Sequence, residues 1–141
     1  MRSGSYPWSF PFVDDFKEKY GYDLVSKLNE LFFDEGDYEV TRVDYWKLVT
    51  ELFSENFFKQ IYDFCESRGY KFTGHLLCEE SLISAMRSSG ASMPHYEYLS
   101  IPGMDWLRRP VYDCLTPKAL GSAAAQLGKK QVLSETFALS G

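Results

Sequence analysis

The sequence is poor in cysteine, in clustered basic residues and in long apolar runs, and each shortage argues against a class of protein. Its three cysteines are widely spaced. They form no C-x-x-C pair and no zinc-finger spacing, so neither a disulfide framework nor a structural zinc site is expected. The cysteines are expected to be reduced thiols in a cytosolic protein. No segment approaches the run of about 18 apolar residues that a membrane span needs. The opening residues, MRSGSYPWSF, lack the apolar core of a signal peptide.

Basic residues gather only in short pairs, Arg108-Arg109 and Lys129-Lys130, and the formal net charge is −5. A nucleic-acid-binding protein needs clustered Lys and Arg to displace counterions from phosphates, so nucleic acid is not an expected partner. No glycine-rich phosphate loop follows any expected strand, which argues against a nucleotide-binding protein. Ser134 lacks the flanking glycines of a G-x-S-x-G motif, which argues against an esterase.

Hydrophobic residues, by contrast, make up 45% of the 141 residues, and aromatic residues make up 17%. These contents are sufficient for a packed core, so the chain is expected to fold as one domain. The 11 Phe, 10 Tyr and 3 Trp suit an ordinary core. Aromatic faces are also common in carbohydrate-binding clefts, so the excess is compatible with a sugar ligand.

Hydrophobic periodicity and capping residues predict an alternation of helices and strands. Thr41 is expected to cap the longest helix and Gly69 to end it. Thr116 is expected to cap the last helix, with Pro117 at its first position and Gly128 after its end. The predicted helices cover residues 13–33 with a break near Gly21, 41–68, 82–87 and 117–127. The predicted strands cover 70–77, 93–99 and 130–137. The segment that contains Pro102, Gly103, Trp106 and Pro110 is predicted to be a loop.

The order of helix and strand, repeated three times, predicts parallel strands with right-handed crossovers. Both an open doubly wound sheet and a (β/α)₈ barrel fit this order. A complete barrel needs about 250 residues, so the barrel alternative requires the chain to be a piece of a longer protein.

Functional groups in either architecture gather at the carboxyl ends of the strands. His75 lies near the end of the first predicted strand and Glu79 follows it, His95 and Glu97 lie on the second, and Glu135 lies on the third. Carboxylates at successive strand ends are typical of glycosidases, in which one carboxylic acid protonates the leaving oxygen and a carboxylate attacks or activates water.

Most of these residues also have a structural interpretation. Glu79 would suit the first turn of a helix, where the macrodipole favours acids. His95 would suit a core with satisfied hydrogen bonds. Glu97 would suit an ion pair with an arginine such as Arg87, Arg108 or Arg109. Glu135 differs, because a charge within the apolar run VLSETFAL is costly to bury unpaired. The aromatic candidates for stacking on a sugar, which could equally be packing residues, are Tyr96, Tyr98 and Trp106.

Four ordered blocks of the sequence carry a family resemblance that covers nearly the whole chain. They are PWSFPFVDDFKEKYGYDL, VDYWKLVTELFSENFFKQIYDFCESRGYKFTGHLL, MPHYEYLSIPGMDWL and GKKQVLSETFAL. Together they resemble the catalytic barrel of glycoside hydrolase family 106, a family of α-L-rhamnosidase-like enzymes with many bacterial members.

The resemblance implies that the three strands correspond to the fifth, sixth and seventh of a (β/α)₈ barrel. Glu135 then matches the carboxylate that serves as nucleophile or general base at the end of the seventh strand. His75 and His95 match positions that contact sugar hydroxyls, and Glu79, Glu97 and Trp106 are the remaining substrate-binding candidates. The partner acid is expected at the end of the fourth strand, upstream of the first residue.

We therefore expect residues 1–141 to be a fragment of one glycosidase barrel domain, inactive alone because its partner acid and the rest of its barrel are missing. The expected substrate is a carbohydrate with a terminal rhamnosyl or similar bond. The family resemblance implies an inverting, calcium-assisted reaction, although no calcium ligands can be assigned. The compartment stays open between the cytoplasm and export by a lost signal. The alternative function is a small non-catalytic α/β module that binds carbohydrate.

Overall fold

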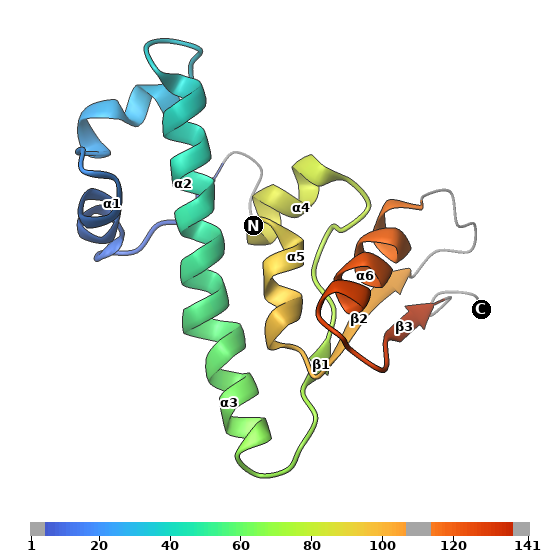
Figure 1. The fold of residues 1–141 in the computed structure, drawn as a ribbon. Helices are drawn as coiled ribbons and strands as arrows, with labels where there is room; N and C mark the ends of the chain where they lie inside the picture. The colour runs from blue at the N-terminus through green and yellow to red at the C-terminus, as the bar shows by residue number, and fades with distance from the viewer. Residues whose placement is uncertain (1–4, 107–113, 137–141) are drawn as a thin grey trace. The chain divides into compact units, whose positions relative to one another are not determined.

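The computed structural model describes residues 5–106 and 114–136 and divides the chain into two compact units, Met1–Val49 and Thr50–Gly141. The first unit is helical. The second holds a small parallel sheet with helices, so the protein is a mixed α/β protein (Figure 1). No helix among the described residues combines the length and the apolarity needed to cross a bilayer.

The first unit contains α1 (Phe12–Tyr20), the 3₁₀ helix η1 (Val25–Leu31) and the beginning of α2 (Tyr38–Phe53). The predicted break near Gly21 is confirmed, because α1 ends there on a left-handed residue with φ 79°. The buried apolar side chains of this unit are Phe12, Phe16, Leu24, Leu31, Tyr45, Leu48 and Val49.

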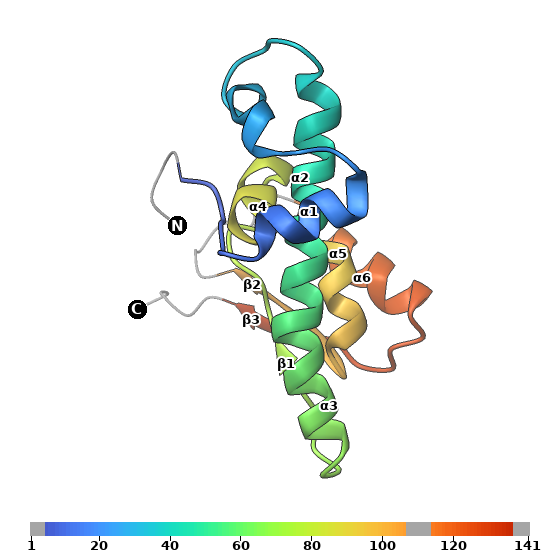
Figure 2. The same ribbon diagram turned by 90° about the vertical axis from the view of Figure 1, so that its left-hand side faces the viewer.

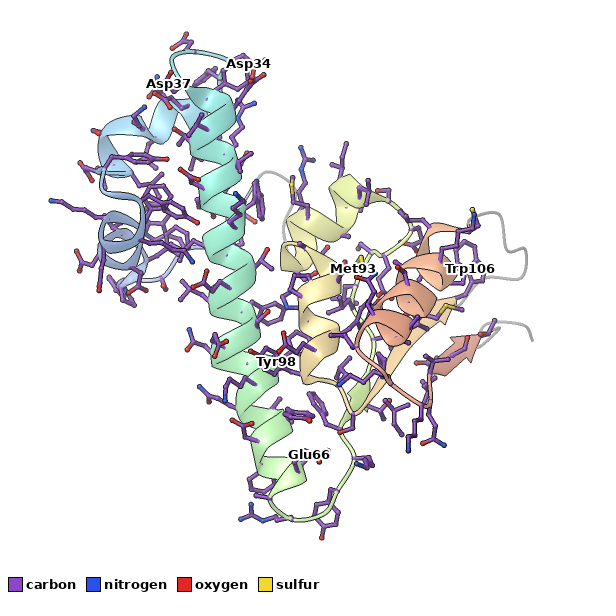
Figure 3. All side chains as sticks on the ribbon, viewed as in Figure 1. Asp34, Asp37, Glu66, Met93, Tyr98 and Trp106 are labelled. Atoms are coloured by element: carbon purple, nitrogen blue, oxygen red, sulfur yellow. The ribbon has the colours of Figure 1, made fainter. Side chains whose placement is uncertain are left out.

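Helix α2 begins at Tyr38, earlier than predicted, so Thr41 is not its cap. The Thr41 hydroxyl instead donates a 2.5 Å hydrogen bond to the buried carboxylate of Glu30. The acidic loop before α2 also forms an ion pair with α2. Asp34 (Figure 3) has its Oδ1 2.8 Å from Nη1 of Arg42. The capping pattern at Thr41 therefore reflects a tertiary hydrogen bond and not a helix start.

The predicted long helix is present as three consecutive segments: α2, a π-helical turn η2 (Ser54–Lys59) and α3 (Gln60–Glu66). Two residues of the π turn contact the buried side chain of His95. Ser54 Oγ lies 2.8 Å from His95 Nδ1, and the ring of Phe58 stacks on the His95 ring with centroids 4.9 Å apart. A π turn inserts one extra residue into the helix, and here both of these contacts come from within it.

The sheet of the second unit has three parallel strands in the order β1-β2-β3: β1 (Thr73–Gly74), β2 (Ile101–Trp106) and β3 (Leu133–Thr136). Figure 1 and Figure 2 show the arrowheads of β2 and β3 on the same side of the sheet. The predicted parallel pairing is confirmed. The sheet is not closed, and β1 is shorter than predicted.

The second predicted strand, 93–99, is wrong. Residues Ser92–His95 form helix α5, and Tyr96–Tyr98 form the 3₁₀ turn η3. Pro94 is tolerated because it lies in the first turn of α5, where backbone N–H groups have no intrahelical acceptor. In this segment His95, Tyr96 and Leu99 are buried by helical turns and not by a strand.

Strand β2 occupies the segment that was predicted to be a loop because it contains Pro102 and Gly103. Both residues are buried in the strand. A Cβ atom at Gly103 would lie 2.6 Å from the carbonyl oxygen of Gly74. Glycine is therefore required for the close approach of β1 and β2, and it does not signal a turn.

The remaining elements agree with their predictions to within two or three residues. Ser81 caps α4 (Leu82–Ser89), and its hydroxyl accepts a hydrogen bond from the Ser84 N–H. Helix α6 (Leu115–Gln126) begins after Cys114, which places Pro117 in its first turn. Residue 137 of the third predicted strand lies outside the described residues. The core of the second unit consists of Phe58, Leu76, Tyr96, Leu99, Leu120 and Ala123.

Candidate functional site

Three polar side chains meet where the parallel strands end. His75 follows β1 directly, Asp105 lies next to the last residue of β2, and Glu135 lies next to the last residue of β3. Asp105 and Glu135 are register partners. His75 lies between them: its Nδ1 is 3.5 Å from Asp105 Oδ2, and its Nε2 is 3.2 Å from Glu135 Oε2. The predicted convergence of His75 and Glu135 is present in the structure.

Glu79 joins this cluster from the loop between β1 and α4. Its side chain is buried, and the Tyr96 hydroxyl donates a 2.6 Å hydrogen bond to Glu79 Oε1. The second oxygen, Oε2, is buried and has no hydrogen-bond partner within the described part of the chain. The cluster contains three polar atoms that lie within 4.8 Å of one another, one each from Glu79, His75 and Asp105. Glu79 is therefore a buried acid that faces the His75 and Asp105 side chains.

The backbone before Glu79 adopts a conformation that is rare for a residue with a side chain. Cys78 has φ 58°, the one positive φ of a non-glycine residue in the ranges that the structure describes. Leu77 and Cys78 on this turn are exposed, whereas Glu79 is buried. The left-handed residue thus reverses the chain at the point where the carboxyl group enters the interior.

The surroundings give the ionisable groups of the cluster different proton affinities. Burial raises the pKa of the Glu79 carboxyl; the hydrogen bond from Tyr96 opposes this effect only in part, and the nearby Asp105 charge adds to it. Burial lowers the pKa of His75, but the Leu76 carbonyl and the charges of Asp105 and Glu135 outweigh it, so the pKa of His75 is raised overall. The cluster therefore combines a carboxyl group and an imidazole that both keep a proton to higher pH than their ordinary pKa values would allow.

His95 is not part of the cluster. Its ring is fully buried, with Nδ1 2.8 Å from Ser54 Oγ and Nε2 2.8 Å from the carbonyl oxygen of Ser89. Burial lowers the pKa of this histidine, which favours the neutral ring. The structure therefore agrees with the alternative of a satisfied core histidine and places no sugar contact there.

The other two substrate-binding candidates lie at different places. Glu97 is an exposed residue of η3, and its backbone carbonyl accepts a 2.9 Å hydrogen bond from Lys129 Nζ. Two of the arginines proposed as its partners, at 108 and 109, lie outside the described residues. Trp106 is half-buried at the end of β2 (Figure 3). Because side chains alternate along a strand, Trp106 faces away from the side of the sheet on which Asp105 lies.

Asp105 was missed by the sequence argument because its segment was predicted to be a loop. The Tyr96 hydroxyl was also missed as a partner of Glu79, since Tyr96 was considered only as a stacking or packing ring. Tyr96 is 1% exposed, so it cannot stack on a sugar in this structure. The available signal for Asp105 was its place in the block IPGMDW, six residues that form a strand whose second-to-last residue is an acid.

The cluster does not match the calcium that the family resemblance implies. Calcium takes about six to eight oxygen ligands. The one group of three potential donors found in residues 5–106 and 114–136 contains an imidazole nitrogen and only two carboxyl groups, and Tyr96 already binds one oxygen of Glu79. No calcium ligand set is assigned to these residues, and no step of the chemistry below depends on a metal.

Comparisons with protein-family models, with curated proteins and with solved structures find no significant match. The family resemblance therefore stays a prediction. What the chain can do has to be inferred from the chemistry of His75, Glu79, Asp105 and Glu135.

Proposed function

We propose that this chain carries the acid and base residues of a glycoside hydrolase that cleaves terminal rhamnosyl or similar bonds. The observation that carries the proposal is the buried Glu79 Oε2, which has no partner in the described residues and lies in the same cluster as His75 and Asp105. Hydrolysis of a glycosidic bond needs a protonated carboxyl group and an ionised one close together. Glu79 and Glu135 have surroundings of these two kinds.

Glu79 is suited to be the general acid. Its Oε1 accepts the hydrogen bond from Tyr96, so a proton on this carboxyl group belongs on Oε2. Oε2 has no hydrogen-bond partner among the described residues. Because Oε2 is buried, the loop after β1 would have to open before the leaving oxygen of a glycoside could reach it. Burial keeps the group protonated at higher pH than an exposed glutamate, as a general acid requires. This assignment would make the expected fourth-strand acid unnecessary.

Glu135 is suited to be the nucleophile or general base. Its side chain is 51% exposed, so its carboxylate is accessible to water and to a substrate. Its Oε2 lies 3.2 Å from Nε2 of the His75 ring, a contact that orients the carboxylate. Glu135 keeps the role that the family resemblance implies for it, and Glu79 would supply the proton that a single carboxylate cannot.

The parallel sheet supports a segment of a (β/α)₈ barrel as the finer architecture. The strands lie in chain order, β1-β2-β3, and each is followed by a helical segment before the next. In a barrel the free edges of β1 and β3 would be paired by neighbouring strands, which also removes edges prone to aggregation. We propose that these further strands belong to the same protein.

The test is hydrolysis of an aryl α-L-rhamnoside by the gene product that contains this chain. Glu79→Gln and Glu135→Gln should each lower kcat at least about 100-fold, because a positioned acid or base contributes about 10²- to 10⁴-fold. Glu80→Gln is the matched control: Glu80 is the exposed neighbour of Glu79 and should keep full activity. Sugar binding without hydrolysis in the wild type would support the carbohydrate-binding module instead.

A further inference from the structure

His75 has a hydrogen-bond arrangement that its expected role as a sugar contact does not explain. Nε2 lies 3.2 Å from Glu135 Oε2. Nδ1 lies 3.1 Å from the carbonyl oxygen of Leu76 and 3.5 Å from Asp105 Oδ2. Both ring nitrogens therefore face oxygen acceptors that belong to the protein, and neither is directed to an empty position.

A neutral imidazole cannot satisfy this arrangement. It carries one N–H and one lone pair, so one nitrogen would point its lone pair at a carboxylate or carbonyl oxygen. The imidazolium form has an N–H at each nitrogen and satisfies both sides. The ionisable groups that surround the ring come from three elements: Glu79 from the loop after β1, Asp105 from β2 and Glu135 from β3. The charges of Asp105 and Glu135 also favour the positive ring.

We propose that His75 is a positively charged bridge that anchors Glu135 to Asp105, acting as a positioning residue and not as a sugar ligand. This inference rests on the proposed function for its catalytic consequence, although the bridge itself is a property of the chain. Asp105 is the fixed end, because its side chain is 23% exposed compared with 51% for Glu135.

The bridge would fix the position of the base. Nε2 of His75 faces one oxygen of the Glu135 carboxylate, and Nδ1 faces the less exposed Asp105. A catalytic base has to be held within hydrogen-bond reach of the group on which it acts. Removal of the ring should therefore leave Glu135 less well positioned and lower the rate of the chemical step without weakening substrate binding.

The bridge can be measured without any substrate, since the chain contains two histidines, His75 and His95. With histidine isotopically labelled in the 141-residue chain, NMR should show two ring signals, assigned with His75→Gln. Asp105→Asn and Glu135→Gln should each lower the pKa of His75 by about one unit. The buried His95 should be unaffected and reports that the fold is intact. If the pKa of His75 is the same in both variants as in the wild type, the bridge is refuted.

Enzyme kinetics on the rhamnoside give the second readout. His75→Gln should lower kcat with little change in KM, because Glu135 is then less well positioned. A rise in KM with kcat unchanged would mean that His75 binds sugar, and would overturn the proposal. An absence of hydrolysis in the wild type, together with a coupled His75 in the NMR titration, would refute the proposed function and leave the bridge established.

Discussion

The Tyr96 hydroxyl and the Glu79 carboxyl form a buried 2.6 Å hydrogen bond that joins the 3₁₀ turn η3 to the loop after β1. The bond leaves one oxygen of Glu79 satisfied and the other unpartnered in the described structure. An acid held in this way has a defined orientation and a defined position for its proton. The pair thus links the packing of the second unit to the chemistry proposed for it.

Tyr96→Phe should make Glu79 a more basic carboxylate. The Tyr96 hydrogen bond stabilises the ionised form, so its loss should raise the pKa of Glu79 further and move the alkaline limb of rhamnoside hydrolysis to higher pH. The variant should also lose about 1–3 kcal/mol of stability, because a buried acceptor is left unsatisfied. Activity against pH and urea unfolding measure the two effects. Tyr70→Phe is the control, since Tyr70 is 63% exposed. If the alkaline limb of Tyr96→Phe stayed at the same pH as in the wild type, the role of the hydrogen bond between Tyr96 and Glu79 would be contradicted.

Glu79 should also make the stability of the protein depend on pH. Its pKa is raised above the ordinary 4.5, so the folded state binds the proton more tightly than the unfolded state. Stability from this group is therefore full below about pH 4.5 and is lost as the pH rises through the folded-state pKa. The glutamine of Glu79→Gln does not ionise, so this loss of stability is absent from the variant. The variant should therefore become more stable than the wild type as the pH rises.

Urea unfolding of both proteins between pH 4 and 8 measures this difference. Glu80→Gln should follow the wild type throughout, because Glu80 is exposed. A constant difference between Glu79→Gln and the wild type at all pH values would show that Glu79 is not perturbed. If Glu79→Gln gained stability and lost activity, this would indicate that Glu79 is kept for function at a cost in stability.

The sequence was sufficient for the elements that follow from local periodicity. The helical pieces around Gly21 and the short helix after Ser81 were predicted from apolar spacing and punctuation, and the parallel pairing was predicted from the order of helices and strands. The sequence displays these features directly. Glu135 was selected as an acid that is costly to bury within an apolar run, but its side chain is 51% exposed, so that reason is wrong.

The features that were missed depend on contacts between distant residues. Strand β2 was predicted as a loop because Pro102 and Gly103 resemble turn residues, and Asp105 was overlooked with it. Thr41 resembled a helix cap, although its hydroxyl binds Glu30. His95 allowed two interpretations until its partners, Ser54 and the Ser89 carbonyl, were known. A local pattern gives no information on which distant backbone lies against a glycine or which hydroxyl reaches a carboxylate.

Gly103→Ala tests whether the site depends on the close approach of β1 and β2. The added Cβ would lie 2.6 Å from the carbonyl oxygen of Gly74, which is backbone and cannot rotate away. The strands should separate at a cost of about 1–3 kcal/mol, and His75 should move relative to Asp105. We expect a lower urea midpoint and a His75 NMR titration that shifts toward the one in Asp105→Asn.

Gly121→Ala is the matched control for this substitution. Gly121 lies within α6, and a Cβ there would meet no atom within 4 Å. Because alanine is a better helix former than glycine, this variant should gain about 0.5–1 kcal/mol and leave the His75 titration unchanged. If Gly103→Ala were as stable as Gly121→Ala and titrated like the wild type, the contact between Gly103 and Gly74 would not be what holds His75 against Asp105. The cluster would then have to be maintained by the Tyr96 and Glu79 side of the site.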